Sequence, residues 1–299
     1  MDPTAHTKEP TDPRKRFSSP PFPQLKQKAP GSAEDLHPQA DYGEETYTGS
    51  GKLLGRAALI TGADSGIGRA IALCYAKEGA DVLFTCLSEE KRDADETVRL
   101  VEATGRRAVA LPGDIRQKSF CEHLVDQTVS SFGRLDILVN NAAYQRSHSK
   151  LEDMPEDEFD ATFRTNVYGT FFMTQAALPR MKPGSSVINT VSIQGYDPTE
   201  TLLSYAATKA ALINMTKSFA KFAIKDGVRV NAVAPGPVWT PLIPATMPQM
   251  EVIMFGSKSL FGRPAQPVEQ AVIYVFLASD DASYVTAEVY GATGGMSPV

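Results

Sequence analysis

Short apolar runs rich in β-forming residues alternate with longer segments of helical periodicity from Gly51 onward. This alternation is typical of βαβ units built around a parallel sheet. We therefore predict a single α/β domain over residues 51–299, a doubly wound parallel sheet of seven strands. The expected strands are Ala57–Thr61, Asp81–Cys86, Ala108–Leu111, Asp136–Asn140, Ser186–Thr190, Arg229–Ala234 and Glu288–Gly291. The expected helices are Ile67–Glu78, Ala94–Thr104, Ser119–Phe132, Glu156–Met181 with a break near Asn166, Leu202–Lys225 and Pro267–Ala278.

The first fifty residues follow a different pattern. They hold eight of the 21 prolines and show almost no apolar periodicity. Such a segment lacks the apolar residues for a core of its own, so we predict an extended Pro-rich arm over residues 1–50. Two arrangements remain open: a solvated tail, which the composition favours, or an arm that lies along a neighbouring subunit.

Composition and charge narrow the classes of function. With 30 Lys+Arg against 35 Asp+Glu, the net charge is −5, so the chain lacks the basic excess of a dedicated nucleic-acid binder. We find no export or import signal and no apolar stretch long enough to span a membrane. The three cysteines, Cys74, Cys86 and Cys121, and the four histidines lack metal-type spacing. We expect a cytoplasmic protein with reduced thiols and no bound metal.

A glycine-rich turn follows the first expected strand. Residues 57–68 read AALITGADSGIG, an apolar strand that leads into a turn with Gly62, Gly66 and Gly68 and then into a helix. Glycines let the backbone turn sharply and approach a pyrophosphate, while the start of the helix attracts its negative charge. The sequence therefore predicts a Rossmann-type nucleotide site at this turn.

Tyr205 and Lys209 form a second candidate site. They lie four residues apart on an expected helix and therefore share one face. A tyrosine has an unperturbed pKa of ~10, and a neighbouring ammonium favours its phenolate. We expect Lys209 to bring the pKa of Tyr205 toward neutrality, so that Tyr205 can act as a general acid or base. A Tyr/Lys pair alone is usually a solvated helix face, so the assignment depends on the motifs around it.

Further motifs follow in a fixed order. They are Asp114 after the third strand, NNAA at 140–143, Asn166, Ser192 after the fifth strand, Tyr205 and Lys209, and PGPVWT at 235–240 after the sixth. Together with the TGxxxGxG turn, this order resembles the short-chain dehydrogenase/reductase family over about residues 52–295. The preceding arm resembles a bacterial subgroup of general-stress-type oxidoreductases and aldehyde reductases.

The resemblance implies hydride transfer between NAD(H) or NADP(H) and a small carbonyl/alcohol pair. In the implied catalytic set, Tyr205 moves the proton, Ser192 holds the same oxygen and Lys209 also binds the nicotinamide ribose. Asn166 opens its helix so that a backbone carbonyl can hold a water. The implied cofactor contacts are Gly62, Asp64, Ser65, Gly66, Ile67, Gly68, Asp114, Ile115, Asn141, Ala142, Tyr205, Lys209, Pro235, Gly236, Val238 and Thr240.

Two other classes of function use the same fold. One is a nucleotide-sensing or scaffold protein that has lost turnover, against which the intact set of four catalytic candidates argues. The other is an epimerase or dehydratase with a Tyr/Lys pair. Against this second class, the TGxxxGxG turn and the PGPVWT segment favour simple dehydrogenation.

The choice of nucleotide depends on the end of the second strand. Cys86 stands where an acidic residue would hydrogen-bond the ribose 2′-hydroxyl and favour NAD(H). Ser88 and the amides of the next helix could bind a 2′-phosphate beside Lys91 or Arg92, although the acids at 89 and 90 oppose it. The sequence leans slightly to NADP(H) and leaves NAD(H) open.

The segment Pro237–Gly262 is irregular and rich in proline and methionine. We predict a substrate lid or, equally, a segment packed between subunits. The expected apolar lining is Trp239, Leu242, Met247, Met250 and Met254.

The apolar stripes near Phe171 and Leu212 and the run Ala287–Ala292 exceed what one subunit is expected to bury. The resemblance implies that such helices pair across two-fold axes, giving a homotetramer.

Overall fold

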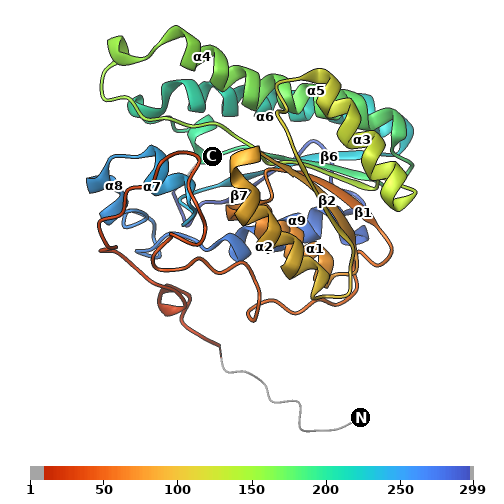
Figure 1. Ribbon diagram of the computed structural model, residues 1–299, viewed down its shortest axis with the longest axis horizontal. Helices are drawn as coiled ribbons and strands as arrows, with labels where there is room; N and C mark the ends of the chain where they lie inside the picture. Colours follow the sequence, from red (N-terminus) through yellow and green to blue (C-terminus); the bar gives the residue numbers. More distant parts are fainter. Residues whose placement is uncertain (1–9, 297–299) are drawn as a thin grey trace, which may run out of the picture.

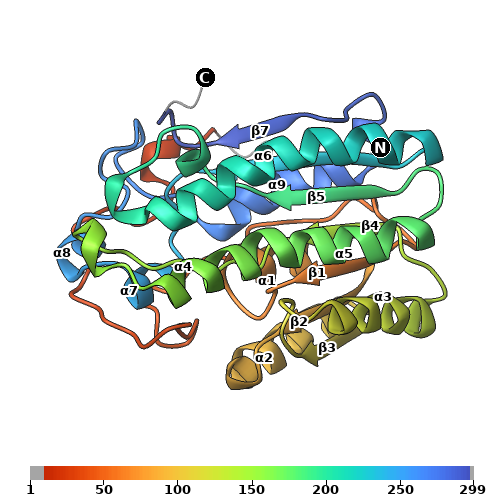
Figure 2. The same ribbon diagram turned by 90° about the horizontal axis from the view of Figure 1, so that it is seen from above.

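The computed structural model describes residues 10–296, so residues 1–9 of the predicted arm and 297–299 of the predicted domain lie outside it. Within this range, seven parallel strands form one sheet in the order β3-β2-β1-β4-β5-β6-β7, with helices on both faces (Figure 1; Figure 2). The doubly wound fold is confirmed. The strands are β1 (Ala57–Thr61), β2 (Asp81–Cys86), β3 (Ala108–Pro112), β4 (Ile137–Asn140), β5 (Ser186–Thr190), β6 (Arg229–Pro235) and β7 (Val289–Ala292).

The helices form two layers, with α1, α2 and α9 on one face of the sheet and α3 to α6 on the other (Figure 1). Their bounds are α1 (Gly66–Lys77), α2 (Lys91–Glu102), α3 (Lys118–Phe132), α4 (Glu156–Phe163), α5 (Gly169–Ala177), α6 (Leu203–Ala223), α7 (Leu242–Thr246), α8 (Gln249–Ile253) and α9 (Pro267–Ala278). Helix α2 begins three residues before the predicted start at Ala94, because its first turn is charged and carries no apolar signal. Each helix in residues 10–296 is too short or too polar to cross a membrane.

The strands separate two apolar cores. Ala58 and Ile60 of β1 pack toward α1 and α9, whereas Leu59 packs toward α3 and α5. This alternation follows from the period of two along a strand, and both faces are covered because the sheet is parallel. All five residues of β1 are buried, so the strand reads as a continuous apolar run.

The predicted break in the long helix Glu156–Met181 is confirmed. Between α4 and α5 the chain makes one π-helical turn over Arg164–Tyr168, and Asn166 is fully buried within it. Turns of this type insert one extra residue per turn and are frequent at functional sites.

The arm is neither a solvated tail nor dependent on a neighbouring subunit for its burial. Phe22, Leu36 and Tyr42 are buried in the core that also holds α1 and α9. The arm runs beside α7, α8 and the start of α2 (Figure 1), and Val268 of α9 donates its backbone N–H to the Asp41 carbonyl at 3.1 Å. The expectation of a solvated tail is therefore wrong for this segment, because its apolar residues are too widely spaced to show a period, yet each is buried against the domain. Contact of the arm with a neighbouring subunit stays a prediction.

The irregular segment Pro237–Gly262 contains two five-residue helices, α7 and α8. Trp239 does not line a lid: it is fully buried, and its ring stacks on Phe22 with 4.2 Å between centroids. Met250, by contrast, is 74% exposed. The predicted apolar lining is therefore divided between the arm interface and the surface.

Candidate active site

The glycine-rich turn joins β1 to α1 in the shape that the sequence predicts. Gly62 and Gly66 have φ of 66° and 54°, the left-handed region that favours glycine. A methyl group on Gly62 would lie 2.9 Å from the Ala142 Cα, and one on Gly68 would collide with the Gly62 carbonyl. Among the described residues, no side chain caps the first amides of α1 at Ser65. The turn therefore offers close backbone approach and free N–H donors, which fit a pyrophosphate.

Arg69 braces this turn from within α1. Its Nε and Nη2 atoms donate to the Asp64 carbonyl at 2.8 and 2.6 Å, and Nη2 also reaches the Asp93 carbonyl at 2.9 Å. Burial raises the pKa of the Asp64 carboxyl to about 6. Burial, and then the charge of Asp64, raise the pKa of Glu90 to about 8. The turn is thus held by a buried guanidinium and flanked by carboxyls that resist ionisation.

The loops after β3 and β4 lie at the same carboxyl edge of the sheet. Asp114 accepts bonds from Arg116, which counteract burial and hold the pKa of Asp114 below its usual range. Ile115 is buried against α5, where a methyl on Gly169 would lie 2.7 Å from its Cδ1. Asn141 donates its side-chain amide to the Gly62 carbonyl at 2.8 Å, which ties the β4 loop to the turn.

The loop after β6 closes the site from the other side. Thr240 is buried, and a Cβ on Gly66 would lie 3.4 Å from its side chain. Val238 pairs with Ala265, and Trp239 Nε1 donates to the Pro38 carbonyl of the arm at 2.8 Å. The predicted contacts Pro235, Gly236, Val238 and Thr240 therefore lie on a loop that the arm holds from behind.

Ser192, Tyr205 and Lys209 come together as predicted. Tyr205 and Lys209 share one face of α6, with the Lys209 Nζ 5.3 Å from the centroid of the Tyr205 ring. The Ser192 Oγ accepts the Gln194 N–H at 3.1 Å, so its own proton remains available for an oxygen in the site. A methyl on Gly195 would lie 2.9 Å from the Lys209 carbonyl carbon, so this glycine lets the Ser192 loop pack on α6.

The pKa of Tyr205 differs from our expectation. Burial raises it to about 12, and a hydrogen bond with Ser192 opposes the rise. Lys209 does not bring it toward neutrality, because burial lowers the pKa of Lys209 itself to about 7. Its Nζ lies over the ring face and donates to the Thr190 carbonyl at 2.7 Å. Tyr205 therefore keeps its proton across the neutral range.

Asn166 connects the β4 loop to α6. Its Oδ1 accepts the Tyr144 N–H at 2.7 Å, and its Nδ2 donates to the Tyr144 carbonyl and to Thr208 Oγ1, each at 3.0 Å. Thr208 in turn donates to the Tyr205 carbonyl at 2.6 Å. The Asn166 carbonyl accepts the Thr170 hydroxyl at 2.8 Å. Asn166 thus ties the loop after β4 to α6 and also lies in the π-helical turn.

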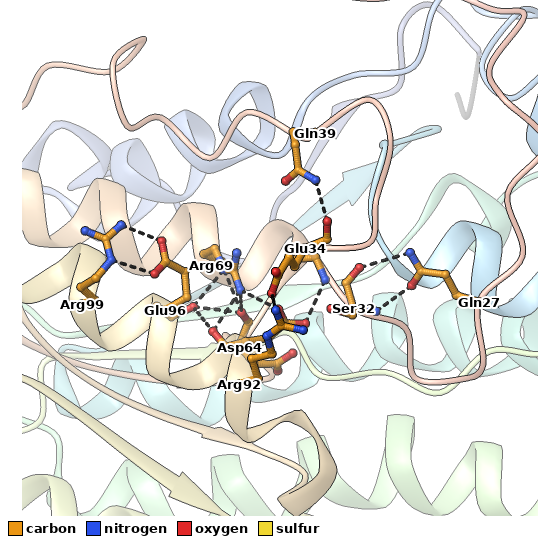
Figure 3. Close-up of polar contacts among 12 residues, drawn as sticks. Gln27, Ser32, Glu34, Gln39, Asp64, Arg69, Arg92, Glu96 and Arg99 are labelled. Carbon is orange, nitrogen blue, oxygen red and sulfur yellow. Dashed lines mark hydrogen bonds and ion pairs between the residues drawn. The ribbon is translucent and has the colours of Figure 1, made fainter.

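The adenosine end differs from the phosphate site we expected. Lys91 pairs with Asp95 at 2.7 Å, and Arg92 pairs with Glu34 of the arm (Figure 3). Cys86 is buried among apolar residues, and burial raises the pKa of its thiol to about 12. Both basic residues are therefore already engaged by carboxylates, which weakens the electrostatic case for a 2′-phosphate.

Sequence reasoning missed four residues around the site: Arg69, Thr190, Thr208 and Tyr274. Thr190 is the last residue of β5, and its carbonyl receives Lys209. Thr208 lies between Tyr205 and Lys209 in the sequence, where no pattern predicts a role for it. Arg69 and Tyr274 lie in largely buried helices, where nothing in the pattern separates them from packing residues.

Comparison with known proteins places this geometry in context. A family model described as "Enoyl-(Acyl carrier protein) reductase" matches residues 62–297. The chain is 47% identical over 290 residues to the Bacillus subtilis oxidoreductase YhxD, covering 96% of this chain and 97% of the relative. It is 42% identical over 272 residues to the Arabidopsis thaliana chloroplastic NADPH-dependent aldehyde reductase 1, covering 89% and 94%. A Burkholderia cenocepacia short-chain dehydrogenase solved with NADP superposes with a TM-score of 0.76 at 33% identity, covering 82% and 98%.

Proposed function

The chain belongs to the short-chain dehydrogenase/reductase family, and from this premise we propose that it is an NAD(P)-dependent oxidoreductase that reduces a small aldehyde or ketone with Tyr205 as proton donor. The observation that carries the proposal is the meeting of Ser192, Tyr205 and Lys209 at the same sheet edge as the glycine-rich turn. The two sites lie at the carboxyl ends of parallel strands, where ligands of such folds bind.

The chain's own residues supply the proton chemistry. A nicotinamide nucleotide, when bound, supplies the hydride that reaches the carbonyl carbon. Ser192 donates its hydroxyl proton in a hydrogen bond to the carbonyl oxygen, and Tyr205 transfers its proton to that oxygen as charge develops there. Burial raises the pKa of Tyr205 to about 12, so the residue carries at neutral pH the proton that reduction, the direction we propose, consumes. Lys209 lies over the Tyr205 ring and, in its protonated form, stabilises the negative charge left there once the proton has been transferred.

The nucleotide would be held by the residues at the carboxyl edge of the sheet. The pyrophosphate fits the amides of the turn, because a Cβ at Gly62 or Gly68 would fill the space beside the backbone. The proposed contacts are Gly62, Asp64, Ser65, Gly66, Ile67, Gly68, Asp114, Ile115, Asn141, Ala142, Tyr205, Lys209, Pro235, Gly236, Val238 and Thr240. Asn166 holds the facing loop in place, and its carbonyl is the proposed site for a relay water.

Replacement of the proposed proton donor tests the function. Tyr205→Phe keeps the ring and should lower kcat by on the order of 10²-fold or more, with nucleotide affinity nearly unchanged. Lys209→Ala should lower both kcat and nucleotide affinity. Tyr284→Phe removes a hydroxyl from a fully exposed tyrosine and is the matched control. Wild-type turnover by Tyr205→Phe would overturn the mechanism.

A substrate panel decides between the enzyme and a retired nucleotide sensor. Aldehydes, ketones, secondary alcohols and sugars are followed at the nicotinamide absorbance with both nucleotides. We expect the highest kcat/KM for reduction of a small aldehyde or ketone. Nucleotide binding without turnover of any member would favour the sensor.

Breaking the Glu34–Arg92 ion pair tests the choice between NADP(H) and NAD(H). Glu34→Gln frees Arg92 at the start of α2 and should raise the NADP(H)/NAD(H) ratio of kcat/KM by a few fold, up to about tenfold. Glu96→Gln frees Arg99 two turns later on the same helix and is the matched control. Equal ratios in the two variants would mean that Arg92 lies away from the ribose.

The proposed assembly is a homotetramer. Tyr168, Phe171 and Phe222 are exposed on the α5–α6 layer, which favours pairing there. Leu212, which we expected at an interface, is instead buried against Val191 and Ala232 of its own subunit. Light scattering measures the state directly, and a monomer would overturn the assembly. A cytoplasmic location stays a prediction.

A further inference from the structure

A buried polar chain runs behind the catalytic lysine. Tyr274, fully buried in α9, places its hydroxyl 2.8 Å from Thr190 Oγ1. Thr190 Oγ1 lies 3.4 Å from Asn141 Oδ1, and the Asn141 amide donates to the Gly62 carbonyl at 2.8 Å. The Thr190 carbonyl is the acceptor for Lys209 Nζ. One threonine therefore links Lys209, the glycine-rich turn and a tyrosine from the opposite helical layer.

The direction of the hydrogen bonds follows from the donors available. The Asn141 amide nitrogen donates to the Thr61 and Gly62 carbonyls, which leaves its Oδ1 as an acceptor. Thr190 has one hydroxyl proton, and it is given to Asn141. Either oxygen of the Thr190–Tyr274 pair can donate, and with the Thr190 proton directed to Asn141 the donor is the Tyr274 hydroxyl.

We propose that Tyr274 is a positioning residue for the reaction: by donating to Thr190, it fixes both the carbonyl that anchors Lys209 and the amide that holds the nucleotide turn. The inference rests on the proposed function, and Tyr274 itself need not touch substrate or nucleotide. A buried hydroxyl without its partner is costly, and loss of the Tyr274 hydroxyl would take from Thr190 the shorter of its two side-chain hydrogen bonds.

Tyr274 acts as a fixed donor and not as a second acid. Burial raises its pKa above that of an ordinary tyrosine, so it keeps its proton at working pH. A second buried tyrosine provides a matched control. Tyr75 in α1 donates its hydroxyl to the Tyr274 backbone carbonyl at 3.1 Å, so its removal costs a buried hydrogen bond in the same place without reaching Thr190.

The test compares Tyr274→Phe with Tyr75→Phe in nucleotide affinity by calorimetry, in kcat and KM, and in melting temperature. Both variants should melt somewhat lower. Only Tyr274→Phe should also weaken nucleotide binding and lower kcat, each by roughly five- to twentyfold, as expected from one lost buried hydrogen bond. Equal binding and kinetic constants in the two variants, measured well below melting, would show a structural role only and overturn the proposal.

Substitutions at Thr190 sharpen the same test. Thr190→Val removes the hydroxyl at constant shape and should reproduce Tyr274→Phe, whereas Thr190→Ser keeps the hydroxyl and should stay within about twofold of wild type. The double variant Tyr274→Phe/Thr190→Val should be no worse than either single change, because both break one chain. Fully additive losses would contradict the link. If wild type binds nucleotide without turnover, the proposed function fails, and calorimetry still tests Tyr274.

Discussion

The glycine-rich turn and the loop after β6 approach the same site from opposite sides, yet they are shaped in different ways. The turn owes its form to its own residues, because Gly62 and Gly66 adopt φ values that other residues avoid. The loop Pro235–Thr240 is held from behind by the arm, whose Pro38 carbonyl binds Trp239 from 201 residues earlier in the chain. One wall of the site is encoded locally and the other by a distant segment.

The arm also reaches the locally encoded wall. Tyr42 lies against Arg69, with 4.8 Å between the guanidinium carbon and the ring centroid, and the Ala33 N–H donates to Asp93 Oδ2 at 2.9 Å. Figure 3 shows the arm residues beside Asp64, Arg69 and the first turns of α2. The segment that the sequence sets apart as a tail therefore braces both walls.

Of the changes considered, removal of the arm should have the largest effect on the stability of the protein. Deletion of residues 1–40 uncovers Trp239 and takes away the buried side chains of Phe22 and Leu36. Large-to-small changes at single buried sites cost about 2–5 kcal/mol, so the deletion approaches the whole stability of a domain. We expect little folded protein or a melting temperature lower by more than about 10 °C. A truncated protein with the wild-type melting temperature would contradict this role of the arm.

A single substitution at the arm interface should give the next largest effect. Phe22→Ala removes the ring stacked on Trp239 and should cost about 3 kcal/mol or more. Because Trp239 is the only tryptophan in the chain, its fluorescence should report the change directly. Leu54→Ala, at a 76% exposed site, is the control and should be near neutral. If Phe22→Ala leaves stability unchanged, the loop after β6 does not depend on the arm for its position.

A substitution in the glycine-rich turn should act mainly on nucleotide affinity. Gly68→Ala pushes a methyl into the Gly62 carbonyl and to 2.7 Å from Asn141 Nδ2. Nucleotide affinity should fall on the order of 100-fold by calorimetry, because the backbone must move away from its ligand. Gly105→Ala strains an open surface turn instead and should lower stability by about 1 kcal/mol with affinity intact. Unchanged affinity in Gly68→Ala would show that the turn tolerates displacement.

The smallest expected effect is a change in how the stability of the protein depends on pH. The folded pKa of Asp64, about 6, lies above its ordinary value of 3.8, so the stability gained from its protonated form is lost as pH rises through 6. Asp64→Asn should therefore unfold with about 1–3 kcal/mol more free energy at pH 8, the difference shrinking toward pH 4.

The matched variant at Asp114 should behave in the opposite sense. Arg116 holds the pKa of Asp114 low against the effect of burial, so its stabilising charge is present above its unfolded pKa and lost as pH falls. Asp114→Asn should be less stable than wild type at pH 8. Denaturant unfolding at several pH values measures both, and two shifts of the same sign would contradict the electrostatics described here.

Several features could be predicted because their cause is local. The strands Ala57–Thr61, Asp81–Cys86 and Ser186–Thr190 were predicted to the residue, since each is a short run with β-forming residues at its centre that is buried along its whole length. The shared face of Tyr205 and Lys209 likewise follows from helix geometry, whereas the break at Asn166 was expected from the family resemblance. Boundaries moved where the first helical turn is charged, as at the start of α2.

Other features depend on surroundings that no short stretch contains. The pKa of Tyr205 is higher than we expected. Burial lowers the pKa of Lys209 and so reduces the positive charge that we expected to lower the pKa of Tyr205. Trp239 was assigned to a lid or to packing between subunits because its partner, Phe22, lies in a segment without periodicity. Tyr274 gave no signal at all, since a buried tyrosine in an apolar helix resembles any packing residue.

By itself, the sequence determined the order of strands and helices, the glycine-rich turn and the spacing of Ser192, Tyr205 and Lys209, because dihedral preferences and helical or strand periods act over a few residues. Only the tertiary structure decided where the arm lies, which way Lys209 donates and what stands behind Thr190. Burial, pKa and hydrogen-bond partners are set by residues that are far apart in the chain and meet only when the sheet and its helical layers are complete.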